Sequence, residues 1–360
     1  MVWAKPALFQ NERQSPSQKA HMNAHPTPLK FLMPGWFSVV MGLVGLALAW
    51  HSAAPVMGEA ATGVSLVLGA LAVLVFGVVL VLSVVRFNRY PEAVAEDLRH
   101  PVRHAFVAAF PVSMLLLATL AVALGWSGMG WSVLWCAGSL GQFAVTVWVL
   151  KRWLVVSPAQ AGGSPPPFWP VVTPVLLIPV VGNVLAPLAG GALGFGLWSL
   201  AQFGVGLLLW PVVLALLLAR RAAMGPLPDR LLPAWFITLA PPSVVGLVAL
   251  QKQLPVEVVA MVWGTGVFFL LWAGSIAKQA VSQPFALPFW GLSFPIAAFT
   301  SLTLKLSVWA QAPALQLVGL LLLALVSVVV VGLVLGTYKG LRNGSLLAPE
   351  PVAAIVPVQG

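Results

Sequence analysis

Ten long apolar runs follow one another along most of this chain, and they constrain its fold more than any other feature. About twenty apolar residues are enough for a helix to span the hydrocarbon core of a bilayer. The runs fall near residues 31–51, 62–86, 102–124, 131–154, 169–187, 193–219, 234–251, 256–279, 287–308 and 313–338. Only 7% of the residues are charged, against about 25% in a soluble domain. We therefore predict an all-α polytopic membrane protein with ten transmembrane helices.

The basic residues orient these spans. If the N-terminus is cytoplasmic, 16 of the 18 lysines and arginines fall on the cytoplasmic side, and only Lys252 and Lys305 fall outside. Such a bias is typical of membrane topology, and it predicts that both termini are cytoplasmic. The polar first thirty residues contain no early apolar segment typical of a signal peptide. We expect a transmembrane domain over residues 29–342 between flexible cytoplasmic tails at 1–28 and 343–360.

Proline separates odd spans from even ones, except that the sixth span contains Pro211. The third, fifth, seventh and ninth spans carry prolines near mid-membrane, and the first carries small residues on one face instead. These residues are Pro111, Pro174, Pro179, Pro241, Pro242 and Pro295, and Ser38, Gly42, Gly45 and Ala49. A broken backbone at membrane depth is tolerated where protein or a water-filled cavity satisfies the freed carbonyls. The alternation predicts five helical hairpins, with kinked inner helices around a central pore and regular outer helices.

The ninth span has a small-sided stripe suited to a pore wall. At helical spacing, Gly291, Phe294, Ala298, Ser301 and Lys305 share one face. The stripe holds one aromatic side chain, Phe294, beside Pro295, and one cation about 16 Å further along the axis. We predict that the Phe294 ring is a gate. Ordinary core packing for Phe294 and an interfacial position for Lys305 are the alternatives.

The chemistry-bearing residues argue against an enzyme. All eight acidic residues fall in tails, loops or span ends, and the single cysteine, Cys136, excludes a disulfide within the chain. His100 and His104 have the spacing of a metal pair, but Pro101 separates them and no third ligand is evident. We expect no metal, no cofactor and no nucleic-acid partner. With no acid at mid-membrane, passive anion flow is favoured, and anions would be ranked by ease of dehydration.

Five segments carry a resemblance to a known family. They are PGWFSVVMGLVGLALAW at 34–50, EDLRHPVRHAFVAAFP at 96–111, VGNVLAPLAGGALGF at 181–195, LPAWFITLAPPSVV at 232–245 and SQPFALPFWGLSFPIAAFTSLTLKL at 282–306. Together they resemble the family of the bacterial tellurite-resistance protein TehA, the yeast malate carrier and the plant slow anion channels. Each segment alone is modest in specificity, whereas five in order on a ten-span frame are specific together.

This resemblance implies a homotrimer in a bacterial inner membrane, in which each protomer has its own pore closed by the phenylalanine of the ninth helix. That residue is Phe294 here, and Lys305 falls on the lysine of the plant channels' motif. Phe110, Asn183 and Pro241 occupy matched inner-helix positions; with the neighbouring Pro111 and Pro179, they are included in the expected pore lining. The long phosphorylatable tails of the plant channels are absent, so kinase gating is not implied.

Two other functions stay open at this stage. A proton-coupled carrier of dicarboxylates, other organic anions or tellurite would use a titratable acid, for which Glu257 is the candidate. A membrane scaffold or sensor that transports nothing would have a sealed interior. The sequence does not select the anion.

Overall fold

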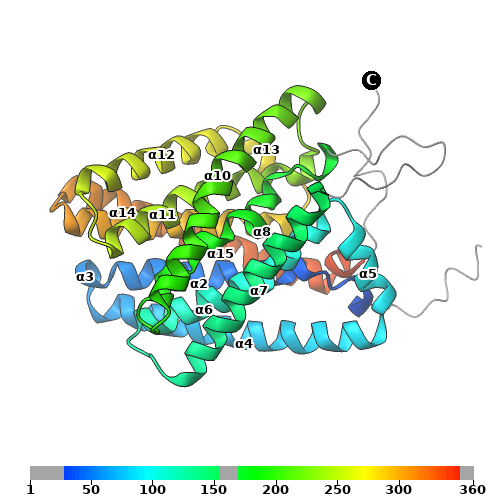
Figure 1. The fold of residues 1–360 in the computed structure, drawn as a ribbon, viewed down its shortest axis with the longest axis horizontal. Coiled ribbons are helices and arrows are strands. Elements are labelled where there is room, and N and C mark those ends of the chain that lie inside the picture. Colours follow the sequence, from blue (N-terminus) through cyan, green and yellow to red (C-terminus); the bar gives the residue numbers. More distant parts are fainter. Residues whose placement is uncertain (1–27, 155–168, 349–360) are drawn as a thin grey trace, which may run out of the picture.

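The computed structural model describes residues 28–154 and 169–348, and these are helical with no strand among them. Within these two stretches, nine helices are long and apolar enough to cross a membrane. Most of the predicted N-terminal tail, and the C-terminal residues from 349 onward, lie outside the described residues. The protein is thus an all-α polytopic membrane protein; in Figure 1, α2 and α4 lie along the long axis, whereas α7 and α10 cross it obliquely.

Five long helices are continuous, and much of each lies on the surface of the protomer. They are α4 (Glu59–Arg89), α7 (Met129–Leu154), α10 (Gly196–Met224), α12 (Val256–Gly274) and α15 (Pro313–Arg342). Only 22–33% of the residues in their most apolar windows are buried. Because leucine and valine dominate the exposed large apolar side chains, these faces suit contact with lipid. We call these five the outer helices.

The other five segments are buried and broken, and we call them the inner segments. They are η2 (Pro34–Trp36) with α2 (Phe37–Ser52); η3 (Arg103–Ala108) with α6 (Ala109–Ala123); the short pieces η5 (Pro174–Leu176), α8 (Leu177–Val181), η6 (Gly182–Leu185) and α9 (Pro187–Gly190); η7 (Asp229–Leu239) with α11 (Ala240–Gln251); and η8 (Leu287–Leu292) with α14 (Ser293–Trp309). In the four that are long enough to span, 72–89% of the most apolar window is buried. The inner segments therefore form the core.

The inner segments close into a ring. Around it, α2 packs on α6, α6 on the short pieces Pro174–Gly190, these on α11, α11 on α14, and α14 back on α2. Each inner segment also packs on the outer helix that follows it in the chain. Glycines on several outer helices make room for these contacts: a Cβ on Gly266 would lie 2.5 Å from the Phe299 ring, and one on Gly319 2.6 Å from Leu304. Such small-residue notches let membrane helices approach closely.

The prolines break the inner segments in a different way from the one expected. Instead of kinking a continuous α-helix, each inner segment begins as a 3-10 helix and becomes α-helical further along. Pro111, Pro241 and Pro295 lie in the first turn of α6, α11 and α14 respectively. The missing N–H of proline removes no hydrogen bond there, because first-turn N–H groups have no partner within the helix. The proline is thus well placed where the helix type changes.

The fifth predicted span is the largest departure from expectation. It is not one helix but a series of short helices from Trp169 to Gly190, none long enough to span alone. Four prolines in this stretch prevent a continuous hydrogen-bonded ladder. The exposed carbonyls are satisfied by the neighbouring outer helices, as described below.

Short elements mark the two ends of the protein. α5 (Pro91–Arg99), η1 (Pro28–Phe31) and η9 (Ser345–Leu347) lie at one end, which we call the α5 end, and η1 and η9 pack on each other there. α3 (Ala54–Met57) lies at the other, which we call the α3 end (Figure 1). Of the remaining short elements, η4 (Trp169–Val171) opens the fifth segment, and α13 (Ala277–Val281) follows α12.

Candidate functional site: a central cavity and two charged ends

A cavity lies inside the ring of inner segments. All five inner segments contribute side chains to it, and none of the five outer helices does. Its lining includes Ser38 from α2, Phe106 from η3, Ile237 from η7, and Gly291 and Phe294 from the last segment. The space open to the centre of a water molecule is about 60 Å³, enough for a few waters. The cavity is therefore a narrow central space enclosed by the ring.

The lining is apolar. Ser38 is the only hydroxyl-bearing side chain among the lining residues, and its Oγ donates a 2.6 Å hydrogen bond to the carbonyl of Gly35. The indole of Trp290 donates away from the cavity, to Thr337 at 2.9 Å. No charged side chain of the described residues lines this space. Any ion inside it would be bound weakly and would lose much of its hydration.

Phe294 lies where this cavity ends along α14. Pro288, Trp290 and Gly291 line the cavity before it, and Phe294 and Pro295 are the last residues of this segment that do so. The Phe294 side chain is only 7% exposed. A Cβ on Gly45 would lie 3.1 Å from its ring, so α2 supports the ring from one side. Beyond it, towards Lys305, Ala298 and Ser301 are buried on α14, and the Ser301 hydroxyl donates to the carbonyl of Ala297.

Of the residues predicted to line a pore, Ser38, Pro241, Gly291, Phe294 and Pro295 line this cavity. The other predicted residues are absent from its lining. The cavity also takes side chains that the prediction omitted, such as Met41, Phe106, Val112 and Ile237. No sequence signal distinguishes these from other apolar residues of the same spans.

Three predicted pore residues pack between helices instead. Gly42 faces Trp290 and Ser293, and an added Cβ would collide with both. Phe110 packs with Phe37 and Phe76, at ring centroid distances of 4.9 and 6.0 Å. Pro111 lies against glycines of α7. These residues bring inner segments close to their neighbours and do not contribute to the cavity lining.

Asn183 and Pro179 belong to a polar network behind the cavity. The Asn183 amide donates to Thr146 at 2.8 Å, and its oxygen accepts from Gln202 at 2.9 Å. Gln142 donates to the carbonyls of Ile178 and Pro179, both at 3.0 Å. The outer helices α7 and α10 thus supply the hydrogen bonds that the broken fifth segment lacks. The sequence analysis above does not predict this network, although glutamines within apolar spans, Gln142 and Gln202, are a pattern that indicates buried hydrogen bonds.

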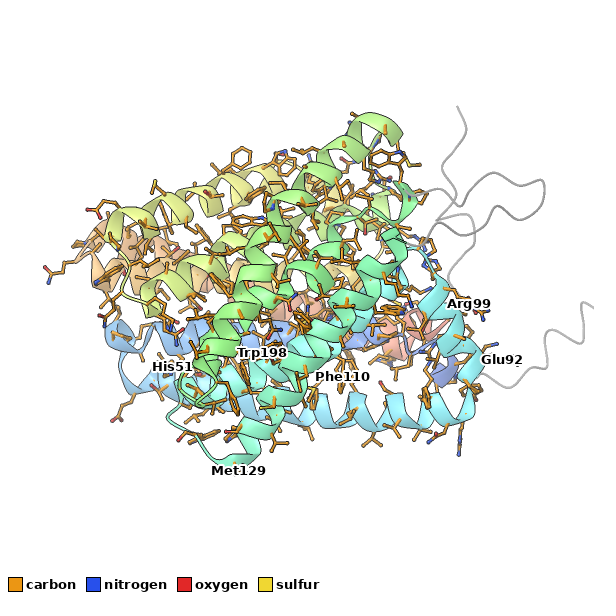
Figure 2. All side chains as sticks on the ribbon, viewed as in Figure 1. His51, Glu92, Arg99, Phe110, Met129 and Trp198 are labelled. Carbon is orange, nitrogen blue, oxygen red and sulfur yellow. The ribbon has the colours of Figure 1, made fainter. Side chains whose placement is uncertain are left out.

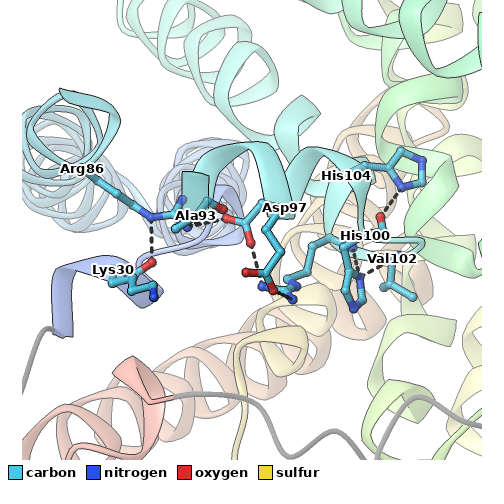
Figure 3. A network of polar contacts seen from close by, with 9 residues as sticks. Lys30, Arg86, Ala93, Asp97, His100, Val102 and His104 are labelled. Atoms are coloured by element: carbon cyan, nitrogen blue, oxygen red, sulfur yellow. Dashed lines mark hydrogen bonds and ion pairs between the residues drawn. The ribbon is translucent and has the colours of Figure 1, made fainter. Parts of the chain in front are cut away.

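The α5 end carries a buried ion-pair network (Figure 3). Asp97 accepts from Arg86 and from Arg103, both at 2.7 Å, and Arg103 also reaches Glu96 at 3.1 Å. The guanidinium of Arg86 also donates to the backbone carbonyl of Lys30 at 3.0 Å. Arg103 lies one 3-10 turn before Phe106, which lines the cavity. The network therefore holds η1 and α5 beside the start of the third span.

The two histidines of this end have structural partners. His100 Nδ1 accepts from the backbone N–H groups of Val102 and Arg103, both at 3.1 Å, and His104 Nδ1 bonds the His100 carbonyl at 2.9 Å. Burial, chiefly, and then the charge of Arg103 lower the pKa of His100 to about 4. The described residues contain no group of three or more possible metal ligands. The His100–His104 spacing thus reflects a capping turn.

The α3 end carries a second pocket, of about 320 Å³, lined by His51, Ser52, Ala54, Pro55, Lys305 and Val308. Figure 2 shows His51 far from Glu92 and Arg99, which lie at the α5 end. The pocket joins the end of α2 to the end of α14. Lys305 thus lies in this pocket, about three helical turns beyond Phe294.

These features define a class of protein: a polytopic α-helical membrane protein with five broken inner segments around an apolar cavity. The sequence profile of the voltage-dependent anion channel (SLAC1) family matches residues 32–338. The chain belongs to this family, whose members are anion channels and transporters.

Individual relatives are distant. The chain is 26% identical to an uncharacterized transporter of Methanocaldococcus jannaschii, over 76% of this chain and 83% of the relative. It is 25% identical to a tellurite resistance protein TehA homolog of Haemophilus influenzae, over 75% and 80% of the two chains. It is 23% identical to the S-type anion channel SLAH2 of Arabidopsis thaliana, over 60% of this chain and 40% of that one.

Proposed function

We propose that this protein is a passive anion channel, or a channel-like transporter, whose path runs through the ring of inner segments and is closed by the Phe294 ring. One observation carries the proposal. All five inner segments line the cavity, no outer helix does, and the lining along α14 ends at Phe294. A bulky ring at the end of a narrow apolar space excludes water as well as ions, and a dry constriction is a barrier to conduction.

The preference for anions rests on charge. No carboxylate lines the cavity or the pocket at the α3 end, whereas Lys305 lines that pocket and has no ion-pair partner among the described residues. Basic residues raise the local concentration of anions. Because the passage itself offers few polar groups, anions that lose water easily would pass fastest. The relatives whose names describe an S-type anion channel and a tellurite resistance protein are consistent with an anionic substrate.

The membrane arrangement is part of the proposal. We infer that the α5 end is cytoplasmic, because α4, α7, α10 and α15 all carry lysine or arginine near the end of the helix at that side. Both termini would then be cytoplasmic, in a bacterial inner membrane. The homotrimer rests on the resemblance to TehA-like proteins.

Anion flux through purified protein in liposomes tests the gate. Phe294→Ala should raise chloride or nitrate flux at least about 10-fold, which corresponds to a barrier lower by about 1.4 kcal/mol. Phe294→Trp keeps a large ring and should stay near wild type. Phe268→Ala removes a ring from the exposed face of α12 and should change nothing. Unchanged flux in Phe294→Ala would contradict the assignment of Phe294 as the gate. A cation flux equal to the anion flux would contradict the preference for anions.

A proton-coupled carrier has less support. Glu257, its candidate acid, is exposed in the first turn of the outer helix α12 and lines neither pocket. Glu257→Gln should therefore leave flux and its dependence on a pH gradient unchanged. Loss of gradient-driven uptake in this variant would support the carrier instead.

A further inference from the structure

The pocket at the α3 end combines two nitrogen-bearing side chains from different inner segments. His51 is in the last turn of α2, and Lys305 is in the last two turns of α14. Both line the same pocket, whose volume of about 320 Å³ is several times what one water molecule needs. The rest of the lining is apolar apart from Ser52, whose hydroxyl donates to the carbonyl of Leu48 at 2.8 Å. The pocket thus has room for a small ion that keeps part of its hydration.

Neither nitrogen group is neutralised. Among the described residues, Lys305 forms no ion pair, because the acids that do so, Glu96 and Asp97, are at the α5 end. His51 Nδ1 is buried and lacks a hydrogen-bond partner within the described part of the chain. Lysine supplies three N–H donors, and the imidazole supplies one when neutral and two when protonated. Unpaired donors around a polar opening in an apolar surface are suited to an anion.

We propose that this pocket is an anion-docking site formed by Lys305 and His51, whose charge rises from +1 to +2 when His51 takes up a proton. Its ligand would be a small inorganic or carboxylate anion that approaches from the α3 end. Acidification on that side would then strengthen docking. The proposal deepens the conduction proposed above and rests on it for the flux readout, although anion binding can be measured without flux.

No acid of the described residues lines this pocket. α3, α6 and the neighbouring parts of α14 carry no carboxylate. On α4, Glu59 is exposed and does not line the pocket, and Arg86 and Arg89 are at the other end of the helix. On α15, Lys339 and Arg342 are likewise at the other end. Lys305 is therefore the charged group that faces His51, and protonation of His51 adds to an already positive site.

Flux measured in the Phe294→Ala background tests the proposal, because conduction past the gate no longer limits the rate. On lowering the pH at the α3 side stepwise from about 8 to about 4, through and below the usual range of histidine, chloride entry from that side should rise about 3-fold or more. His51→Gln should abolish this rise. His51→Lys should give high entry at both pH values. Lys305→Gln should lower entry at both, and Lys305→Arg should preserve it.

Chloride binding in detergent separates this proposal from the conduction proposal. Broadening of the ³⁵Cl NMR line by the purified protein should grow on acidification, lose that growth in His51→Gln, and fall in Lys305→Gln. Lys252→Gln, which alters a cation at the same end that does not line the pocket, is the control and should leave the broadening unchanged. If flux is absent but broadening follows this pattern, docking stands and conduction fails. If flux is present but neither His51→Gln nor Lys305→Gln alters flux or broadening, the docking site is overturned.

Discussion

The inner segments and the outer helices are both long apolar stretches, yet they differ in backbone and in burial. The outer helices are continuous over 19 to 31 residues, with 22–33% of their most apolar windows buried. The four spanning inner segments change from 3-10 to α-helix and are 72–89% buried. Lipid offers no hydrogen bonds, so a backbone facing it is mostly regular, with the exposed Pro211 of α10 as an exception, whereas a backbone surrounded by protein can be broken. Hydropathy therefore identifies the segments that span the membrane, and a continuous α-helix distinguishes those that face lipid from those that face the core.

Polar side chains on the outer helices follow from the same rule. α7 and α10 carry buried Gln142, Thr146 and Gln202 only where they face the broken fifth segment. The large apolar residues that the outer helices expose are mainly leucine and valine. The irregular backbone of the inner ring thus depends on hydrogen bonds from the outer helices as well as on packing.

Proline substitutions should show the largest difference between the two rings. Val328→Pro, on the exposed face of α15, removes a hydrogen bond that lipid cannot replace and should cost about 3 kcal/mol or more. Pro295→Ala should change stability by less than about 1 kcal/mol, because Pro295 is in a first turn where no hydrogen bond is lost. Unfolding in detergent micelles measures both. A large effect of Pro295→Ala would mean that this proline does more than mark the change of helix type.

Removal of one outer-helix amide should have the next largest effect. Gln202→Leu leaves the Asn183 oxygen and the Ser139 hydroxyl without their partner, and should cost about 2 kcal/mol. Gln279→Leu alters an exposed amide with one long contact to Asp229, and should stay within about 0.5 kcal/mol of wild type. The same unfolding measurement compares them. Equal effects would mean that the fifth segment does not depend on α10 for its hydrogen bonds.

Replacing glycine by alanine should lower the stability when the glycine is at a close contact of an inner segment, and raise it when the glycine is on the open face of an outer helix. Gly42→Ala in α2 would push against Trp290 and Ser293, and should destabilise by about 1–3 kcal/mol. Gly63→Ala in α4 meets nothing within 4 Å, and should stabilise by up to about 1 kcal/mol through helix propensity. Thermal midpoints in detergent give both signs. Stabilisation by Gly42→Ala would contradict the close approach of α2 and α14.

The smallest expected effect is a pH dependence just before the second inner segment, at His100. The folded protein holds the pKa of His100 near 4, below the usual 6.5, so the unfolded chain binds the proton more readily. The contribution of neutral His100 to the free energy of unfolding is fully present above pH 6.5 and is lost as the pH falls towards 4. After solvent screening, we expect this loss to be about 1 kcal/mol. Melting at several pH values should show this fall, and His100→Asn should lack it. A rise in stability on acidification that depends on His100 would contradict the assignment.

The ring could be predicted from sequence, but the residues facing its centre could be predicted only in part. Prolines and glycines in alternate spans indicate which segments are broken. Gly291 and Phe294 share a face as predicted, because they are three residues apart across a 3-10 turn. Phe106 lines the cavity, whereas Phe110 does not. The family resemblance, not helical spacing, puts Phe110 in the expected lining. Because an α-helix turns 100° per residue and a 3-10 helix 120°, residues four apart across the change from η3 to α6 do not share a face. Helix type, which the sequence pattern did not show, decides the lining.

The contacts of the fifth segment and of His51 were also beyond the sequence pattern. Asn183 was placed in the pore, yet its partners Thr146 and Gln202 come from helices before and after it in the chain. Nothing in the sequence pattern singles out His51, whose pocket exists only because α14 brings Lys305 beside the end of α2. Pairings between distant segments require the three-dimensional packing.

Accessibility of the cavity to a membrane-impermeant thiol reagent tests the central claim most directly. In a Cys136→Ser background, Ile237→Cys places one thiol in the cavity lining. With Phe294 present, reagent added at the α3 side should react slowly, and Phe294→Ala should speed that reaction about 10-fold, equivalent to a barrier lower by about 1.4 kcal/mol. The rate from the α5 side should change little. Rapid labelling from the α3 side with Phe294 in place, unaffected by Phe294→Ala, would contradict the claim that this one ring closes the passage.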